Sequence, residues 1–375
     1  MARRRSARGM VVAKVRSAQT ILVLLFLLPV LTACSSPGQD TEEALSRMDL
    51  TSTQGAVSTP PSSYPTQVGT STPDSVSTIP ANPNPIRRLE PGEYLTYTTI
   101  DGDGDGGVWL TVNLIDQDAD LQLPIAQLPL GSTITFSQAR MQLAYAAPKS
   151  NVLSGTDLHI RDIQTEADLL VPSGSNCSWP SYSPRGEQIA LVCEGQQQGL
   201  FILDLNEGSL QPILDADQVG GDLLIWPAWS PMGDKIAFVR VKEGPRSDPV
   251  SGIYLATTTC SVGDTSCSSE IEGPVSTCTG RTVWAPTGDL LACADGSSLR
   301  VIDLEDRLEK SISAPDLIES LAWAPSGHTL ALSISNADQG RYTEVFLLDM
   351  DFAGLSRLTT GGGSKNVLSW VTIHD

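Results

Sequence analysis

The fold is decided by a short stretch of sequence that reads WSPMGDKIAFVRV at residues 229–241. Its first half places Ser, Pro and Gly directly after an aromatic residue. Proline fixes φ at the first corner of a turn and glycine relieves the far corner, so the chain reverses its direction here. The second half is a short run rich in β-branched and aromatic residues, which is typical of a strand. The stretch therefore predicts two strands joined by a tight turn.

The same anchor recurs along the chain. It consists of an aromatic residue, Ser or Ala, Pro, any residue and Gly, and an alanine follows eight residues after the aromatic one. Complete copies begin at Tyr182, Trp229, Trp284 and Trp323. A degenerate copy begins at Phe136 with Ala144 in the expected place, and Trp370 opens a sixth copy. The anchors are spaced by 46, 47, 55, 39 and 47 residues, which is the length of a four-stranded propeller blade.

The rest of each repeat is also predicted to form strands. A third strand follows the alanine and usually ends in aspartate, at Asp162, Asp204, Asp303 and Asp349. The strand around Trp370 needs three partners, because an open edge invites aggregation. Residues 94–100, 107–115 and 119–125 supply them from the other end of the domain. We therefore predict an all-β fold, a β-propeller of six four-stranded blades closed by N- and C-terminal strands, with seven blades as the alternative.

The repeat W-S-P-x-G-x-x-[IL]-A-[FL], followed by an I-Y-x-x-D-like strand, resembles that of TolB-like β-propellers. The resemblance covers roughly residues 130–375, and the motif is specific to the repeat rather than to a function. It implies the propeller fold. This chain differs from TolB in its N-terminal organisation, where a lipid anchor and a linker are predicted.

The N-terminal part has the features of an export signal and a spacer. Six basic residues precede an apolar run at residues 20–33, which is too short to span a membrane. Leu31-Thr32-Ala33-Cys34 resembles the lipobox of bacterial lipoproteins, the alternative being an ordinary cleavage site with a chance cysteine. We expect a lipoprotein signal peptide at 1–33, lipidation of Cys34, a Ser/Thr/Pro-rich disordered linker at 34–93 and the propeller at 94–375.

The composition restricts the partners. The chain has 24 Lys and Arg against 43 Asp and Glu, a net charge of −19. An acidic protein repels phosphate backbones, so nucleic acid is not expected as a partner. The signal and the linker predict an extracytoplasmic protein in the cell envelope, lipid-anchored to a membrane.

Six cysteines remain beside Cys34, and an even number in an exported protein favours disulfides. Cys177 and Cys193 lie eight residues either side of Arg185 in one hairpin, which predicts a bridge. Cys278 and Cys293 are placed similarly but about three residues out of register, which would leave Cys260 to pair with Cys267. The connectivity of these four stays open. Zinc is the alternative for clustered thiols, but CxxC-like spacing is missing.

One aspartate run could bind a metal. Asp101, Asp103 and Asp105, followed by Gly106, resemble the start of a calcium loop. The acidic residue expected later in such a loop is missing, since Trp109 and Val112 stand at the candidate positions. A solvated hairpin turn is the alternative, so calcium is a possible ligand and no other cofactor is expected.

The sequence holds few signals of catalysis. It contains three histidines, His159, His328 and His374, for which we expect surface or structural roles. Neither a nucleophile elbow nor a phosphate-binding loop occurs. We therefore expect a binding module for an extracytoplasmic protein or glycan, not an enzyme. The alternative is a hydrolase or lyase that acts on polysaccharides or peptides through acidic residues in the propeller funnel.

Overall fold

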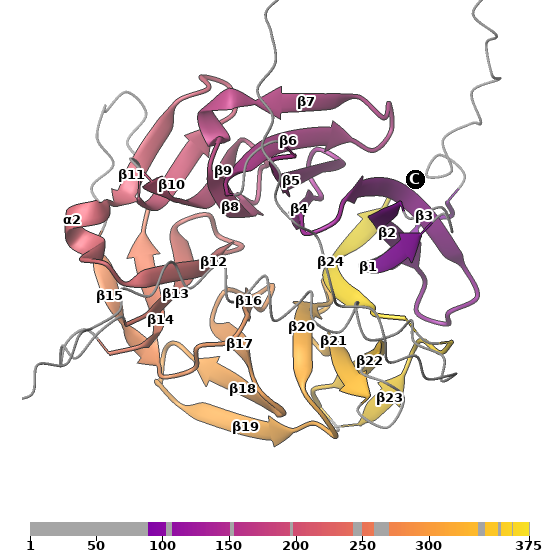
Figure 1. The fold of residues 1–375 in the computed structure, drawn as a ribbon. Helices are drawn as coiled ribbons and strands as arrows, with labels where there is room; N and C mark the ends of the chain where they lie inside the picture. The colour runs from indigo at the N-terminus through magenta and orange to yellow at the C-terminus, as the bar shows by residue number, and fades with distance from the viewer. Residues whose placement is uncertain are drawn as a thin grey trace, which may run out of the picture. The chain divides into compact units, whose positions relative to one another are not determined.

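The computed structural model describes residues 89–102, 107–150, 154–195, 198–242, 250–258, 270–336, 342–351, 354–361 and 363–374. These residues form six four-stranded antiparallel sheets arranged around one axis (Figure 1). The prediction of a six-bladed propeller is confirmed. Two short helical elements interrupt the strands of the described part, η2 (Pro172–Gly174) and α2 (Ala216–Val219).

We number the blades along the chain and give the strands of each from the axis outwards. Blade 1 contains β24 (Asn366–Ile373), β1 (Gly92–Gly102), β2 (Val108–Ile115) and β3 (Gln122–Pro129). Blade 2 contains β4 (Thr133–Ser137), β5 (Gln142–Pro148), β6 (Thr156–Asp162) and β7 (Asp168–Val171). Blade 3 contains β8 (Cys177–Tyr182), β9 (Gln188–Cys193), β10 (Gly199–Asp204) and β11 (Leu210–Leu214).

The other three blades follow the same plan. Blade 4 contains β12 (Leu223–Trp229), β13 (Lys235–Val241), β14 (Gly252–Thr257) and β15 (Ile271–Ser276). Blade 5 contains β16 (Thr282–Trp284), β17 (Leu290–Asp295), β18 (Ser298–Asp303) and β19 (Glu309–Ser313). Blade 6 contains β20 (Ile318–Trp323), β21 (Thr329–Asn336), β22 (Tyr342–Asp349) and β23 (Leu355–Arg357). Each innermost strand contacts the innermost strands of the two neighbouring blades, so the ring is closed.

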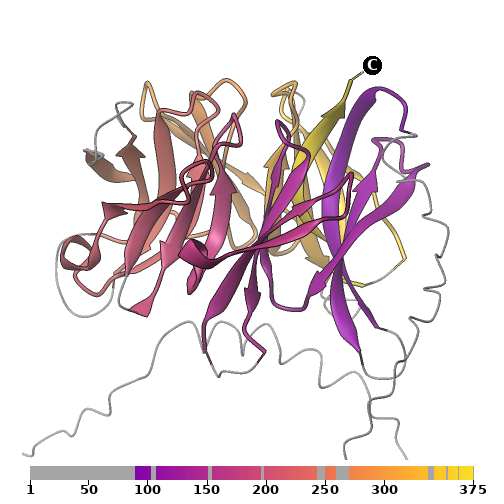
Figure 2. The same ribbon diagram turned by 90° about the horizontal axis from the view of Figure 1, so that it is seen from above.

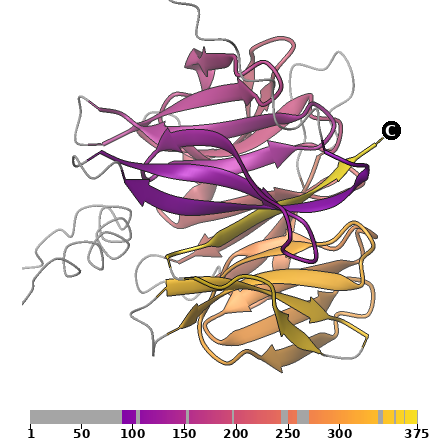
Figure 3. The ribbon, with the colours of Figure 1, turned by 90° about the vertical axis from the view of Figure 1, so that its right-hand side faces the viewer.

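Blade 1 is shared between distant parts of the chain. Its innermost strand β24 pairs with β1, and Figures 1 and 3 show this yellow strand beside the indigo ones. The sequence predicted this closure, but placed the third partner at 119–125 instead of 122–129. Asp116 explains the difference. Its carbonyl oxygen accepts from the Ala119 amide and its side chain from the Leu121 amide, so a turn with Ala119 at φ +62° precedes β3.

The anchors form the turns between the first and second strands of blades 3 to 6. Their glycines, Gly186, Gly233, Gly288 and Gly327, have φ between +71° and +80°. Each glycine amide donates to the carbonyl oxygen three residues earlier, at 2.8–3.0 Å. A Cβ on three of them would touch the anchor proline of the preceding blade, at 3.4–4.0 Å. The turns therefore pack against one another around one end of the ring, which we call the turn end.

The aspartates that end the third strands stabilise a second set of turns. Asp204 Oδ1 accepts from the amides of Asn206 and Glu207 in blade 3. In blade 5, Asp303 Oδ1 accepts in the same way from the amides of Glu305 and Asp306. The equivalent hydrogen bonds to Asp162 outweigh its desolvation and lower the pKa of this carboxyl group. These aspartates are therefore structural. Figure 2, which shows the ring from its side, shows strands running between the two ends.

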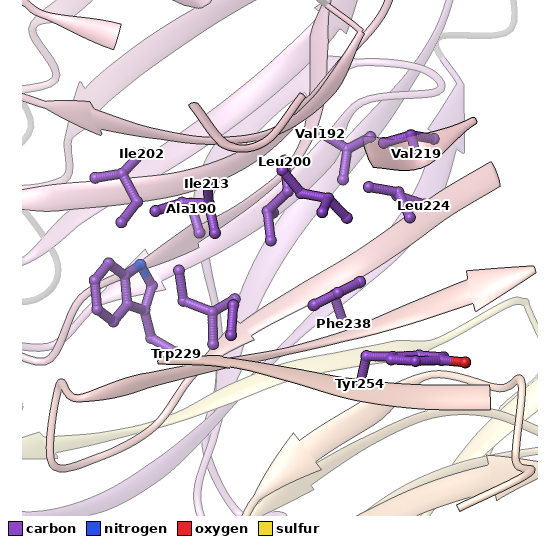
Figure 4. Packing of buried hydrophobic residues seen from close by; sticks show 13 residues of the cluster. Ala190, Val192, Leu200, Ile202, Ile213, Val219, Leu224, Trp229, Phe238 and Tyr254 are labelled. Carbon is purple, nitrogen blue, oxygen red and sulfur yellow. The ribbon is translucent and has the colours of Figure 1, made fainter. Parts of the chain in front are cut away.

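The core lies between neighbouring blades. In the cluster of Figure 4, Val192, Leu200 and Ile202 of blade 3 face Trp229 and Phe238 of blade 4. Phe238 and Leu200 are fully buried, whereas the anchor residue Trp229 keeps 8% of its surface exposed. Anchor residues therefore close the interblade core from the side of the axis. Among the described residues, no helix is long and apolar enough to cross a membrane.

Candidate binding site at the start of the innermost strands

The ring has a second end, opposite the turn end. Here the innermost strands begin and the second strands finish, as the pairing of Cys177 with Cys193 shows for blade 3. We call it the upstream end. At this end lie two strained tryptophans, several β-bulges and two charged groups shifted by desolvation. β-Bulges often occur next to binding and active sites, because they redirect a side chain.

Two tryptophans occupy strained positions in adjacent blades. Trp179 and Trp226 have φ of +51° and +52°, in the left-handed region that bulky residues avoid. Each is followed by proline and lies in a bulge, where two residues of the innermost strand face one residue of its partner. Such a conformation costs about 1–3 kcal/mol and persists only where the surroundings impose it. Both rings are partly exposed and pack against the cluster that includes Ile225 and Trp284.

An arginine takes the equivalent position in the next blade. Arg281 lies three residues before the anchor residue Trp284, as Trp226 does before Trp229. Its side chain is partly exposed, yet desolvation lowers the pKa of the guanidinium, and no charged neighbour contributes. Within the described part of the chain, no hydrogen bond or ion pair involves this side chain. The cation is therefore held in the ring without an acidic partner among these residues.

Hydrogen bonds between innermost strands align these positions. The Trp229 amide donates to Ser181 Oγ at 3.1 Å, which fixes β12 against β8. The Trp284 indole donates to the Ala228 carbonyl oxygen at 2.9 Å, which fixes β16 against β12. Residues at the same distance before the anchor thus lie at the same level of the ring. Trp179, Trp226 and Arg281 consequently occupy one level on three consecutive blades.

The backbone at Arg281 is tightly held. A disulfide joins Cys278 to Cys293. The Ala294 amide donates to the Arg281 carbonyl oxygen at 3.0 Å. Gly280 lies so close to β17 that a Cβ would come within 1.4 Å of the Ala294 carbonyl oxygen. Only glycine fits there, and it lets this segment approach β17 despite the shift in register.

A second disulfide joins Cys177 to Cys193 in blade 3, and both bridges lie at the upstream end. The predicted bridge is confirmed, and Cys278–Cys293 is the pairing that the sequence left open. Cys193 is followed by Glu194. Desolvation alone raises the pKa of this carboxyl group. Glu194 itself is an exposed residue. Shifted pKa values of this kind are typical of functional sites.

An acid stands in a third bulge of the innermost strands. Glu319 interrupts the pairing of β20 with β21, between Ile318 and Ser320. Its side chain is partly exposed and accepts a hydrogen bond from Ser335 at 3.0 Å. The upstream end therefore presents aromatic rings, the Arg281 cation and acids on blades 3 to 6.

The structure brings together only some of the residues that the sequence singled out. Asp101 is exposed at the end of β1, where its carboxylate accepts from Thr99 at 2.9 Å. Asp103 and Asp105 lie outside the described residues, so the calcium loop stays a prediction. Cys260, Cys267 and Cys34, the predicted lipidation site, also lie outside the described residues. The described residues contain no cluster of metal-ligating side chains.

The histidines have structural surroundings. His159 of β6 stacks on Tyr145 at 5.0 Å and lies 3.0 Å from Asp168, to which the Tyr145 hydroxyl also donates. Burial and this hydrogen bond raise the pKa of Tyr145. His328 lies in the anchor turn of blade 6, 3.1 Å from Asp351. His374 follows β24. These residues belong to different parts of the fold and do not converge on one site.

Trp179, Trp226 and Arg281 were not among the site residues predicted from the sequence. One signal was available: the dipeptide Trp-Pro stands three residues before the anchor aromatic in two successive repeats, at Trp179 and Trp226. Aligning the next repeat to them would have placed Arg281 in the same column. Its desolvation, however, depends on the packing of neighbouring blades and has no sequence signature.

Comparisons with known proteins agree with the fold. No family model and no curated protein matches the sequence. TolB from Acinetobacter baumannii matches with a TM-score of 0.59 and 14% identity, over 75% of this chain and 66% of that one. The putative TolB from Agrobacterium tumefaciens matches with a TM-score of 0.50 and 15% identity, over 76% of this chain and all of that one. The chain thus has a TolB-like six-bladed propeller, and it spans just under two thirds of the first protein.

Proposed function

We propose that this protein is a non-catalytic binding module of the cell envelope. A lipid on Cys34 anchors it, the linker at 34–93 holds the propeller away from the membrane, and the upstream end binds an extracytoplasmic protein or glycan. Disulfides form and persist in oxidising compartments, so the bridges of blades 3 and 5 support a location outside the cytoplasm.

One observation carries the binding role, namely the strained pair Trp179 and Trp226. A fold that needed these rings only for packing could place them in relaxed strands, as it does with Trp229 and Trp284, whose positions are not strained. Strain of this kind is concentrated at ligand sites, where it fixes side chains before the ligand arrives. Tryptophan is also among the residues enriched in binding hot spots.

Crosslinking on intact cells tests the proposal. The full chain is expressed with a photoreactive residue in place of Glu194, and a control chain carries it in place of Met232, an exposed residue of an anchor turn. We expect a specific protein or glycan adduct from the first position and none from the second. Equal labelling at both positions, or none at either, would contradict binding at the upstream end.

A further inference from the structure

The environment of Arg281 is unfavourable for an isolated charge. Two other partly buried arginines have carboxylate partners: Arg240 pairs with Asp222 at 2.8 Å and Arg300 with Glu309 at 3.0 Å. Arg281 has none among these residues, while desolvation penalises its charged form. A desolvated cation without a partner destabilises a fold. An anion that reached it would form a charge-assisted hydrogen bond in surroundings where water competes weakly.

The neighbouring surface indicates what else such a ligand contains. Trp179 and Trp226 lie at the same level on the two preceding blades, and both pack against one cluster together with Leu223 and Val241. The side chains of this cluster are apolar, and Arg281 and the acids of this end, Glu194 and Glu319, are not among them. Sugars require several polar groups around their hydroxyls, whereas an apolar side chain of a peptide fits such a surface. The net charge of −19 also disfavours a polyanionic glycan more than a ligand with one carboxylate.

We propose that the upstream end binds a peptide segment of a protein partner in which one carboxylate adjoins an apolar side chain. Arg281 binds the carboxylate, and Trp179 and Trp226 contact the apolar side chain. Gly280 and the Cys278–Cys293 bridge hold the arginine in place before binding, which limits the ordering that binding requires. This inference rests on the proposed function and names the class of its partner.

A first experiment needs no ligand. Arg281→Gln removes a desolvated charge that has no partner in the described part, so the urea midpoint of the purified full chain should rise. Arg185→Gln is the matched control, because Arg185 makes the same charge change at an anchor turn with its side chain 85% exposed, and its midpoint should stay unchanged. A lower midpoint for Arg281→Gln would show that the arginine stabilises the fold, and would overturn the inference.

A second experiment measures binding with small probes. Acetyl-leucine carries a carboxylate beside an apolar side chain, and acetyl-leucinamide lacks the charge. We expect acetyl-leucine to shift the indole N–H signals of Trp179 and Trp226 in NMR spectra, assigned with Trp179→Phe and Trp226→Phe, and the amide to bind at least tenfold more weakly. Arg281→Gln should weaken acetyl-leucine binding by the same factor, and Arg185→Gln should leave it unchanged. An acetyl-Asp-Leu amide probe distinguishes a side-chain carboxylate from a terminal one, and binding of either supports the inference.

Three results would contradict the inference. They are equal binding of acetyl-leucine and its amide, unchanged binding in Arg281→Gln, and tighter binding of glucuronate than of both peptide probes. The crosslinking experiment separates this inference from the proposed function. If the wild-type chain captures a partner and Arg281→Gln captures it equally well, the binding role stands and the assignment of Arg281 fails. If the wild-type chain captures nothing, the proposed function itself fails.

Discussion

Glu344 should be among the most sensitive single positions in the fold, because it neutralises a buried cluster where blade 6 meets blade 1. It is 2% exposed, and its carboxylate lies 3.1 Å from Lys365 Nζ and 3.2 Å from Arg357. The Thr359 hydroxyl also donates to it at 2.5 Å. Lys365 is 6% exposed and directly precedes β24, the strand that closes the ring. Removing the carboxylate therefore takes the Glu344 ion pair away from a buried ammonium group.

We expect Glu344→Leu to lower the free energy of unfolding by about 3–5 kcal/mol, the range for breaking a buried pair. Adding Lys365→Met should recover a substantial part of this loss, because the two buried charges are then both absent. Urea denaturation followed by tryptophan fluorescence measures the four corners of this double-mutant cycle. Glu187→Leu is the control: its pair with Arg185 is well exposed, so the loss should stay below about 1 kcal/mol. Strictly additive effects of the two substitutions, or a loss below about 1 kcal/mol in Glu344→Leu, would refute the reasoning.

Three further predictions concern the bridges, the approach of Gly280 and the anchor. Replacing Cys177 and Cys193 by alanine should lower the unfolding free energy by about 3 kcal/mol, given a sequence separation of 16, and peptide mapping without reductant should show the bridge in the wild type. Gly280→Ala should lower the free energy of unfolding in urea by more than about 2 kcal/mol, since the new Cβ meets the Ala294 carbonyl oxygen. A loss below about 0.5 kcal/mol, as for a surface substitution, would contradict this. Cys34→Ala should leave the protein unprocessed or released, and fractionation with the membrane would disprove the anchor.

The repeat made most of the fold predictable. Each anchor carries its own turn chemistry in Pro and Gly, and the four glycines adopt the positive φ that the turn needs. Local chemistry of this kind does not depend on distant parts of the chain. The closure by β24 was also predictable, because a strand without partners at one end of the domain matched three unassigned strands at the other. The error in β3 arose from Asp116, whose hydrogen bonds to the next turn have no periodic signal.

The candidate site could not be predicted in the same way, because its residues depart from the repeat. The residue types associated with catalysis or metals, such as Asp101 and the histidines, do not converge on one site in the structure. A binding surface needs no such residue types. It is recognised here by a conflict between sequence and environment: tryptophan in a left-handed conformation at Trp179 and Trp226, and a charge in desolvating surroundings at Arg281. Both conflicts exist only after the blades have packed.

The positions of the disulfide bridges connect the stability of the fold with the candidate site. Disulfides could stabilise a propeller at any hairpin, yet both described bridges lie at the upstream end, beside the strained and desolvated residues. The turn end is stabilised instead by contacts between neighbouring anchor turns, as at Gly288 against Pro231. Strain at Trp179, and a charge at Arg281 that has no partner among the described residues, both favour local opening of the strands that carry them. A covalent link at the start of those strands opposes that opening, so the cysteines lie where a preorganised site most needs support.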